Sequence, residues 1–141
     1  ATINGVFLAG SVVAKVGLGG TKYFIWSAKI DYSHWINLYG VRQATIISDM
    51  FSHPRVHTVG KKMFFNMKQF NDTDSDIKLF CLCRNNAHIK KIYFGAHFAL
   101  LFALKVFWFY LFTCPSIRKL KIAIPALYAG WNDNFHNNFR T

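Results

Sequence analysis

Apolar residues recur along much of the chain at steps of three and four, which is the spacing of one face of an α-helix. The clearest stripe lies in residues 54–70, where positively charged residues fall between the apolar positions. Its members are Val56, Val59, Met63, Met67 and Phe70. Turn-forming residues at 71–76 then end the pattern. This stretch predicts a helix over 54–70 that buries its apolar stripe.

The rest of the chain also favours helices. Further helices are predicted over residues 4–16, 21–34, 77–89, 95–112 and 116–137. Gly17 ends the first of these, and Pro125 interrupts the last. Because no segment shows the regular alternation of a strand, the pattern predicts an all-α fold, with residues 1–141 forming one domain.

Composition limits the classes of protein that fit. Hydrophobic residues make up 52% of the chain and include 15 Phe, which excludes a disordered protein. The formal charge of +11 keeps nucleic acid and anionic surfaces among the possible partners. Cys81, Cys83 and Cys114 do not make an even set, so we expect reduced thiols in an intracellular protein. No nucleophile–base pairing exceeds chance, so we do not expect an enzyme.

Four ordered segments carry a resemblance to a known family. Three of them are short sequences: Ala14-Lys15-Val16-Gly17 followed by Tyr23, His53-Pro54-Arg55-Val56 followed by Gly60-Lys61-Lys62, and Phe112-Thr113-Cys114-Pro115. The fourth is the segment from Val59 to His88, whose two ends are 88 − 59 = 29 residues apart. Together they resemble the vertebrate globins, and haemoglobin subunits in particular. The resemblance spans most of the chain and is strongest over residues 53–62 and at His88.

The resemblance implies a globin fold of seven to eight helices around a pocket for heme b. In that family the iron is held by a proximal histidine, which implies His88 as the metal ligand here. The implied heme-contacting residues are Val59, Met63, Ala87, Phe94, Phe98 and Phe102. Val59 takes the distal position, where it has no hydrogen bond to donate to bound dioxygen, so the resemblance implies weak retention of that ligand. Arg84 lies one turn before His88, on the side that globins fill with leucine, where an unpaired guanidinium is costly.

The resemblance also implies the partners and the location of the protein. The partners would be dioxygen and other globin subunits in a tetramer, with neither nucleic acid nor a membrane. The location would be the cytoplasm of red blood cells.

Two other classes of protein remain open. Residues 92–113 are interrupted by a single charge, at Lys105, and basic residues flank both ends. Because about 20 apolar residues suffice to cross a bilayer, the chain fits a small basic membrane subunit with one transmembrane helix. In the globin hypothesis the same segment is a buried central helix. The third class is a basic nucleic-acid-binding protein, given 17 Lys and Arg, although these are scattered between apolar runs.

Overall fold

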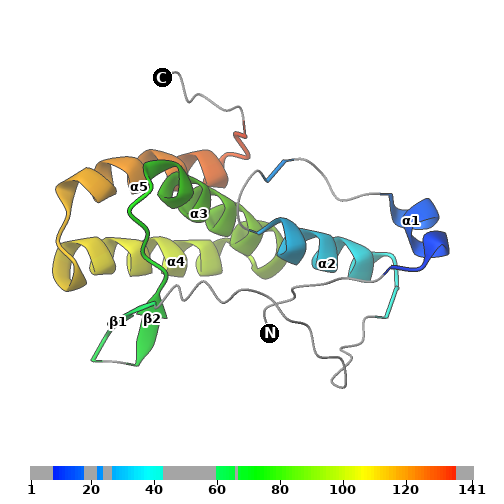
Figure 1. Cartoon of the computed structure of the whole chain (residues 1–141), viewed down its shortest axis with the longest axis horizontal. Coiled ribbons are helices and arrows are strands. Elements are labelled where there is room, and N and C mark those ends of the chain that lie inside the picture. The colour runs from blue at the N-terminus through cyan, green and yellow to red at the C-terminus, as the bar shows by residue number, and fades with distance from the viewer. Residues whose placement is uncertain (1–7, 18–21, 24–26, 43–59, 66, 136–141) are drawn as a thin grey trace.

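The described part of the chain is mostly helical (Figure 1). The computed structural model describes residues 8–17, 22–23, 27–42, 60–65 and 67–135. Within them the elements are α1 (Gly10–Val16), α2 (Ala28–Leu38), β1 (Lys61–Met63), β2 (Lys68–Phe70), α3 (Asp76–Ile89), the π-helical turn η1 (Lys90–Phe94), α4 (Ala96–Trp108), the π-helical turn η2 (Phe109–Thr113) and α5 (Ile117–Trp131).

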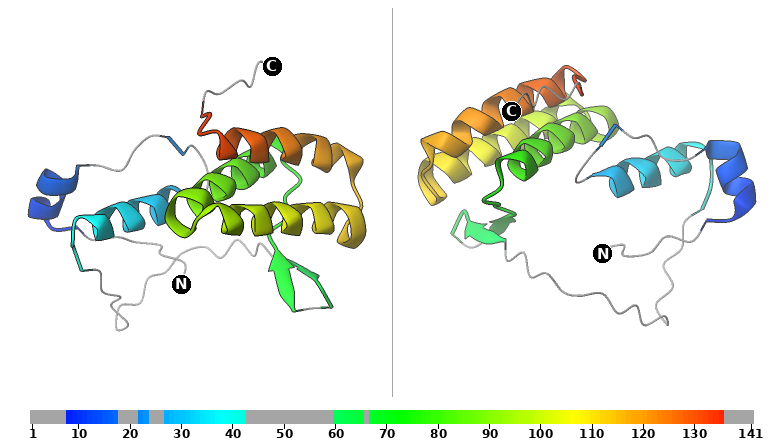
Figure 2. Two further views of the ribbon diagram at one scale, coloured as in Figure 1. Left: turned by 180° about the vertical axis from the view of Figure 1, so that it is seen from behind. Right: turned by 45° about the horizontal axis from the view of Figure 1, so that its top comes forward.

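Helices α3, α4 and α5 lie side by side in both views of Figure 2, and α3 packs against both of the others. The core between them is apolar. It contains Leu79 and Cys83 from α3, Val106 from α4, and Ala123 and Ala126 from α5. Burial of such side chains contributes on the order of 25 cal/mol for each Å² removed from water, so this bundle is the stable centre of the described chain.

Local signals explain where two of these helices begin. The Ser75 hydroxyl accepts a hydrogen bond from the Lys78 backbone N–H at the start of α3, and the Ser116 hydroxyl does the same for Lys119 at the start of α5. A capping serine satisfies one of the backbone donors that a helix start leaves unpaired. Both helices therefore begin where the sequence offers a capping serine.

The absence of a side chain at Gly130 lets α5 approach α3 closely. A Cβ atom at this position would overlap the backbone carbonyl oxygen of Arg84. Only a residue without a Cβ fits there, so Gly130 fixes the spacing between the two helices.

The predicted helix over residues 54–70 is wrong for its described part. Instead, Lys61–Met63 and Lys68–Phe70 form an antiparallel hairpin in which Lys61 pairs with Phe70 and Met63 with Lys68. Phe64 and Phe65 make its turn in the left-handed region, with φ of 50° and 52°. Left-handed residues at a tight turn match the twist of paired strands. Residues 54–59 of the predicted helix lie outside the described residues.

The other predicted helices are present in the structure, although some begin or end at different residues. Those over 77–89 and 95–112 are confirmed as α3 and as α4 continued by η2. The predicted helix over 4–16 is confirmed from Gly10 onward as α1, whereas residues 8 and 9 are not helical and residues 4–7 lie outside the described residues. The prediction over 21–34 is wrong at its ends, because α2 begins at Ala28 and continues to Leu38. Helix α5 runs through Pro125 without splitting and ends at Trp131 rather than at 137.

Candidate functional site

The side of α4 and η2 that faces away from the bundle is apolar. Ala99, Val106, Phe109 and Tyr110 point inward and are buried. The large apolar side chains left exposed on the opposite side are Phe98, Leu100, Leu101, Leu104, Trp108, Leu111 and Phe112. At 100° per residue these seven positions share one half of the helix circumference. A helix of a water-soluble bundle normally carries polar residues there.

This half-helix belongs to a long apolar segment. Residues Ala96–Thr113 form the only described helix that is long and apolar enough to cross a membrane by length and composition. The central helix of a soluble protein passes the same test when it is mostly buried, but only 22% of this segment is buried. Its exposed surface is therefore a contiguous apolar patch, of the kind that marks contact with a protein or a membrane.

A single positive charge lies near the middle of this segment. The Lys105 ammonium is half-buried at the edge of the apolar half and donates a hydrogen bond to the Gln69 backbone carbonyl oxygen, 2.8 Å away. Lys105 Nζ also lies 5.9 Å from the centre of the Phe70 ring. The charge is thus held toward the hairpin, to one side of the exposed leucines.

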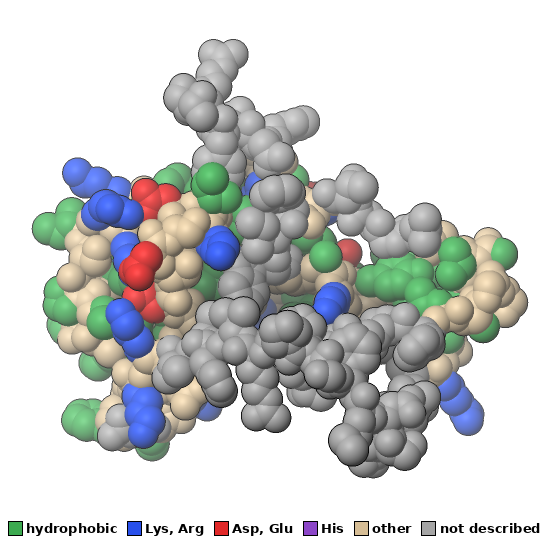
Figure 3. Space-filling view, in the orientation of Figure 1, with side chains coloured by type: hydrophobic (Ala, Val, Ile, Leu, Met, Phe, Trp, Pro, Cys, Tyr) green, Lys and Arg blue, Asp and Glu red, His purple; other side chains and the backbone are tan. Residues whose placement is uncertain are grey.

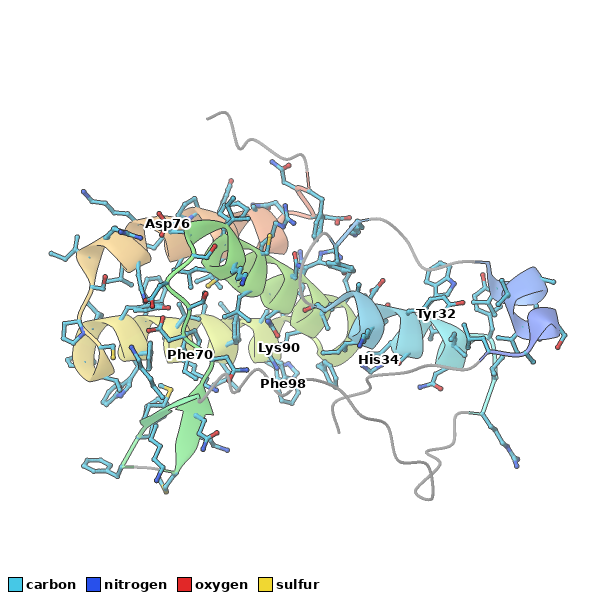
Figure 4. All side chains as sticks on the ribbon, in the orientation of Figure 1. Tyr32, His34, Phe70, Asp76, Lys90 and Phe98 are labelled. Atoms are coloured by element: carbon cyan, nitrogen blue, oxygen red, sulfur yellow. The ribbon has the colours of Figure 1, made fainter. Side chains whose placement is uncertain are left out.

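A groove of about 1020 Å³ runs along α4 next to the hairpin. Its walls come from α4 and η2, from the hairpin, and from the start of α2, which contributes Ser27 and Ile30. The Phe64 ring closes part of it by stacking on Trp108 at a centroid distance of 5.0 Å. In Figure 4, Phe70, Lys90 and Phe98 lie along this side of the bundle. The exposed apolar half of α4 thus continues into a recess that is large enough for a small molecule.

An ion cluster fastens the hairpin to the bundle. The Asp72 carboxylate accepts hydrogen bonds from Tyr110 (2.9 Å), Lys119 (2.8 Å) and Lys61 (2.8 Å). Burial raises the pKa of Asp72, but the hydrogen bonds from Lys119, Lys61 and Tyr110 outweigh it and lower that pKa to about 2. In Figure 3, carboxylates and basic side chains gather at this end of the molecule. The cluster therefore holds in place the hairpin that walls the groove.

His88, the predicted iron ligand, is buried on α3 with only 2% of its surface exposed. Lys22 Nζ lies 2.9 Å from its Nε2, and Asp133 Oδ1 lies 3.5 Å from its Nδ1. The rings of Phe135 and Tyr23 pack on it, with centroids 4.8 Å and 6.0 Å away. Burial and then the charge of Lys22 lower the pKa of His88, so the folded protein favours the neutral imidazole. The imidazole is thus enclosed by Lys22, Asp133 and two aromatic rings.

Arg84, one turn before His88, is also buried. Its Nε donates a hydrogen bond to Asn85 Oδ1 at 3.1 Å, and its guanidinium lies 4.6 Å from the centre of the Phe135 ring. Burial lowers the pKa of Arg84. The guanidinium is thus kept inside the fold among aromatic and amide groups.

The remaining predicted heme-contacting residues are spread over the molecule. Met63 is on β1 and Ala87 is on α3, and both are buried in the core. Phe94, Phe98 and Phe102 lie together along α4 and the turn before it, with the first two rings 5.9 Å apart. Phe98 and Phe102 line the groove. Val59, the predicted distal residue, lies outside the described residues.

The structure therefore places Phe98 and Phe102 at the groove, whereas Phe94 and His88 are not among the residues that line it. Sequence reasoning missed Lys68 and Lys90, which line the groove together with Lys105. Nothing in the local sequence marks these lysines, because the hairpin and the α3–α4 connection bring them to the groove. Among the described residues, no three His, Cys or acidic side chains are placed to hold a metal ion directly.

No family model matches this chain, and no curated protein or solved structure is significantly similar to it.

Proposed function

We propose that this protein is a small basic membrane-associated protein that embeds the exposed apolar half of α4 and η2 in an anionic lipid surface. The observation that carries the proposal is the composition of that half, which is leucine, phenylalanine and tryptophan where a water-soluble bundle would carry polar residues. Water exposure of such a patch is unfavourable, and insertion into the headgroup–acyl boundary relieves it.

The position of Lys105 favours a helix that lies in the plane of the membrane. In a helix that crossed the bilayer, a charge midway along Ala96–Thr113 would sit near the hydrocarbon centre, where a lysine costs about 2.5–3.5 kcal/mol or more. In a helix lying flat, the edge of the apolar half is at the level of the headgroups. There the Lys105 ammonium meets water and phosphates while the leucines enter the hydrocarbon.

Charge supports an anionic surface as the partner. The chain carries +11, and basic residues contribute about 1 kcal/mol each when they lie near a negatively charged leaflet. Lys90 and Lys91 come before α4, and the exposed Lys121 comes after η2, so basic residues stand at both ends of the apolar half.

Flotation with liposomes tests this proposal. We expect the purified protein to float with liposomes that contain anionic phospholipid, to float less with purely zwitterionic ones, and to dissociate partly as salt is raised. Protein that stays at the bottom of the gradient with both kinds of liposome would refute it.

A matched pair of variants locates the contact. Leu104 is 63% exposed on the apolar half of α4, and Leu38 is 74% exposed at the end of α2. About two thirds of the roughly 1.5–3 kcal/mol for burying a leucine is about 1–2 kcal/mol, so L104D should weaken liposome binding roughly tenfold. L38D makes the same chemical change away from α4 and should bind like the unaltered protein.

A second candidate is the heme-binding globin that the sequence resembles, with its seven to eight helices and its partner subunits. It is supported by the resemblance and by the burial of His88, since a histidine that only ends a helix would be solvated. Binding of heme iron would require Lys22 and Phe135 to move away from the imidazole. An optical titration with hemin tests it: a sharp Soret band that H88A abolishes would support it, and a spectrum of free hemin would refute it.

A further inference from the structure

The groove beside α4 combines apolar walls with a basic rim. Most of the side chains that line it are aromatic or aliphatic, among them Phe64, Phe70, Phe98, Phe102, Leu104 and Trp108. Its volume of about 1020 Å³ reaches the upper end of the ~300–1,000 Å³ that is usual for small-molecule sites. An occupant would therefore be a bulky or elongated molecule that is mainly apolar.

Three lysines give this groove a positive rim. They are Lys68 from β2, Lys90 from the start of η1 and Lys105 from α4. They lie close enough for the charges of Lys90 and Lys68 to act on Lys105. None of the described residues that line the groove is acidic. Three cations gathered without a carboxylate among the described residues favour an anionic group at this rim.

The other end of the molecule shows that this arrangement is particular to the groove. There, Lys61 and Lys119 form ion pairs with Asp72, and Arg118 pairs with Asp76. At the groove, Lys105 donates to a backbone carbonyl, and Lys90 Nζ lies 5.9 Å from the centre of the Phe102 ring. The rim lysines thus keep their charge available to an external anion.

From this juxtaposition we propose that the groove takes up one acyl chain of an anionic phospholipid from the bilayer, with its phosphate held by Lys68, Lys90 and Lys105. The inference rests on the proposed membrane association, because the groove opens along the same half of α4. It goes further in naming a specific lipid site within that contact. A bilayer supplies the chain and the headgroup together, in the orientation that apolar walls and a basic rim require.

Quenching of Trp108 by brominated lipids tests the site. Trp108 lines the groove, and bromine atoms on an acyl chain quench a tryptophan only at contact. Two liposome preparations would have the same lipid composition and the same bromine content. In one the bromine is on the anionic lipid, and in the other it is on the zwitterionic lipid. The Trp108 signal is the difference between the unaltered protein and W108F, since the chain has 4 Trp.

We expect stronger quenching of Trp108 when the anionic lipid carries the bromine. In K68Q/K90Q/K105Q this preference should disappear, because nothing then holds the phosphate at the rim. The control K15Q/K62Q/K78Q removes the same charge from exposed lysines outside the groove and should keep the preference.

The outcomes separate this inference from the proposed function. Equal quenching by both preparations, with the protein bound to liposomes, would overturn the lipid site and leave membrane association standing. Equal loss of the preference in both triple variants would also overturn it, because charge alone would then explain the result. A failure of the unaltered protein to bind liposomes would refute the proposed function itself.

Discussion

Replacement of Asp72 by asparagine tests the ion cluster that fastens the hairpin to the bundle. The Asp72 carboxylate is 5% exposed and binds Lys61 from β1, Lys119 from α5 and Tyr110 from η2. An asparagine keeps the size of the side chain but removes the charge that the two lysines face. D72N should therefore loosen the wall of the groove without opening a cavity.

The magnitude follows from the pKa of Asp72. Despite its burial, the hydrogen bonds lower that pKa from 3.8 to about 2. At about 1.36 kcal/mol for each pH unit, the difference of about 1.8 corresponds to roughly 2 kcal/mol. Because the pKa in the folded state is the lower one, this stabilisation is fully present above about pH 4 and is lost as the pH falls toward 2.

Urea unfolding of the two proteins at several pH values measures this effect. At pH 7 the free energy of unfolding of D72N should be lower by about 2 kcal/mol, and the two proteins should converge as the pH falls from 4 to 2. The control is D74N, because the Asp74 side chain is fully exposed and touches only the edge of the cluster, at Lys119. An unchanged stability of D72N at pH 7, or a difference that stays constant down to pH 2, would refute the reasoning.

Two further predictions concern the packing of α3 against α5 and the burial of His88. G130A should lower the free energy of unfolding by about 1–3 kcal/mol or more, because its Cβ would overlap the Arg84 carbonyl oxygen, whereas G10A meets nothing within 4 Å and should leave thermal stability nearly unchanged. A stable G130A would mean that the two helices are farther apart than described. The lowered pKa of His88 means that its contribution to stability is complete above about pH 6.5 and declines as the pH falls below that value. Urea unfolding at pH 7 and pH 5.5 should show this decline in the unaltered protein and in the control H97Q, because the side chain of His97 is exposed. The decline should be smaller in H88Q. Equal declines in all three proteins would contradict the assignment of the pH dependence to His88.

The sequence predicted the bundle helices because their signals are local. Ser75 lies within the turn-forming stretch 71–76, and its hydroxyl caps the helix that follows, so α3 begins within one residue of its predicted start. The apolar run after Gly95 gives an equally clear signal, since neither a charged residue nor a turn former occurs between Ala96 and Leu104.

The hairpin was missed because its apolar residues also fit a helix. Met63 and Phe70 are seven residues apart, which is two helical turns, and both are buried in the hairpin as they would be in a helix. Each strand has only three residues, too few for alternation to show. The left-handed turn at Phe64 and Phe65 lacks the glycine or asparagine–glycine signal that identifies most hairpins.

The sequence also left open which side of α4 is covered. An all-apolar helix has the same sequence pattern whether it is buried, crosses a membrane or lies on one. Periodicity identifies a buried face only when the other face is polar. The positions of α3 and α5 decide that Val106 is covered and Leu104 is not. The neighbours of His88 were unpredictable for a similar reason, since Lys22 is 66 residues away in the sequence.

The most direct measurement places an environment-sensitive fluorophore on the apolar half of α4. A probe on L104C, with C114S to leave only the buried Cys81 and Cys83, would be compared with the same probe on L38C. On addition of anionic liposomes, emission from position 104 should shift to shorter wavelength and brighten, while emission from position 38 should stay that of a probe in water. No change at position 104, or the same change at both positions, would contradict the account.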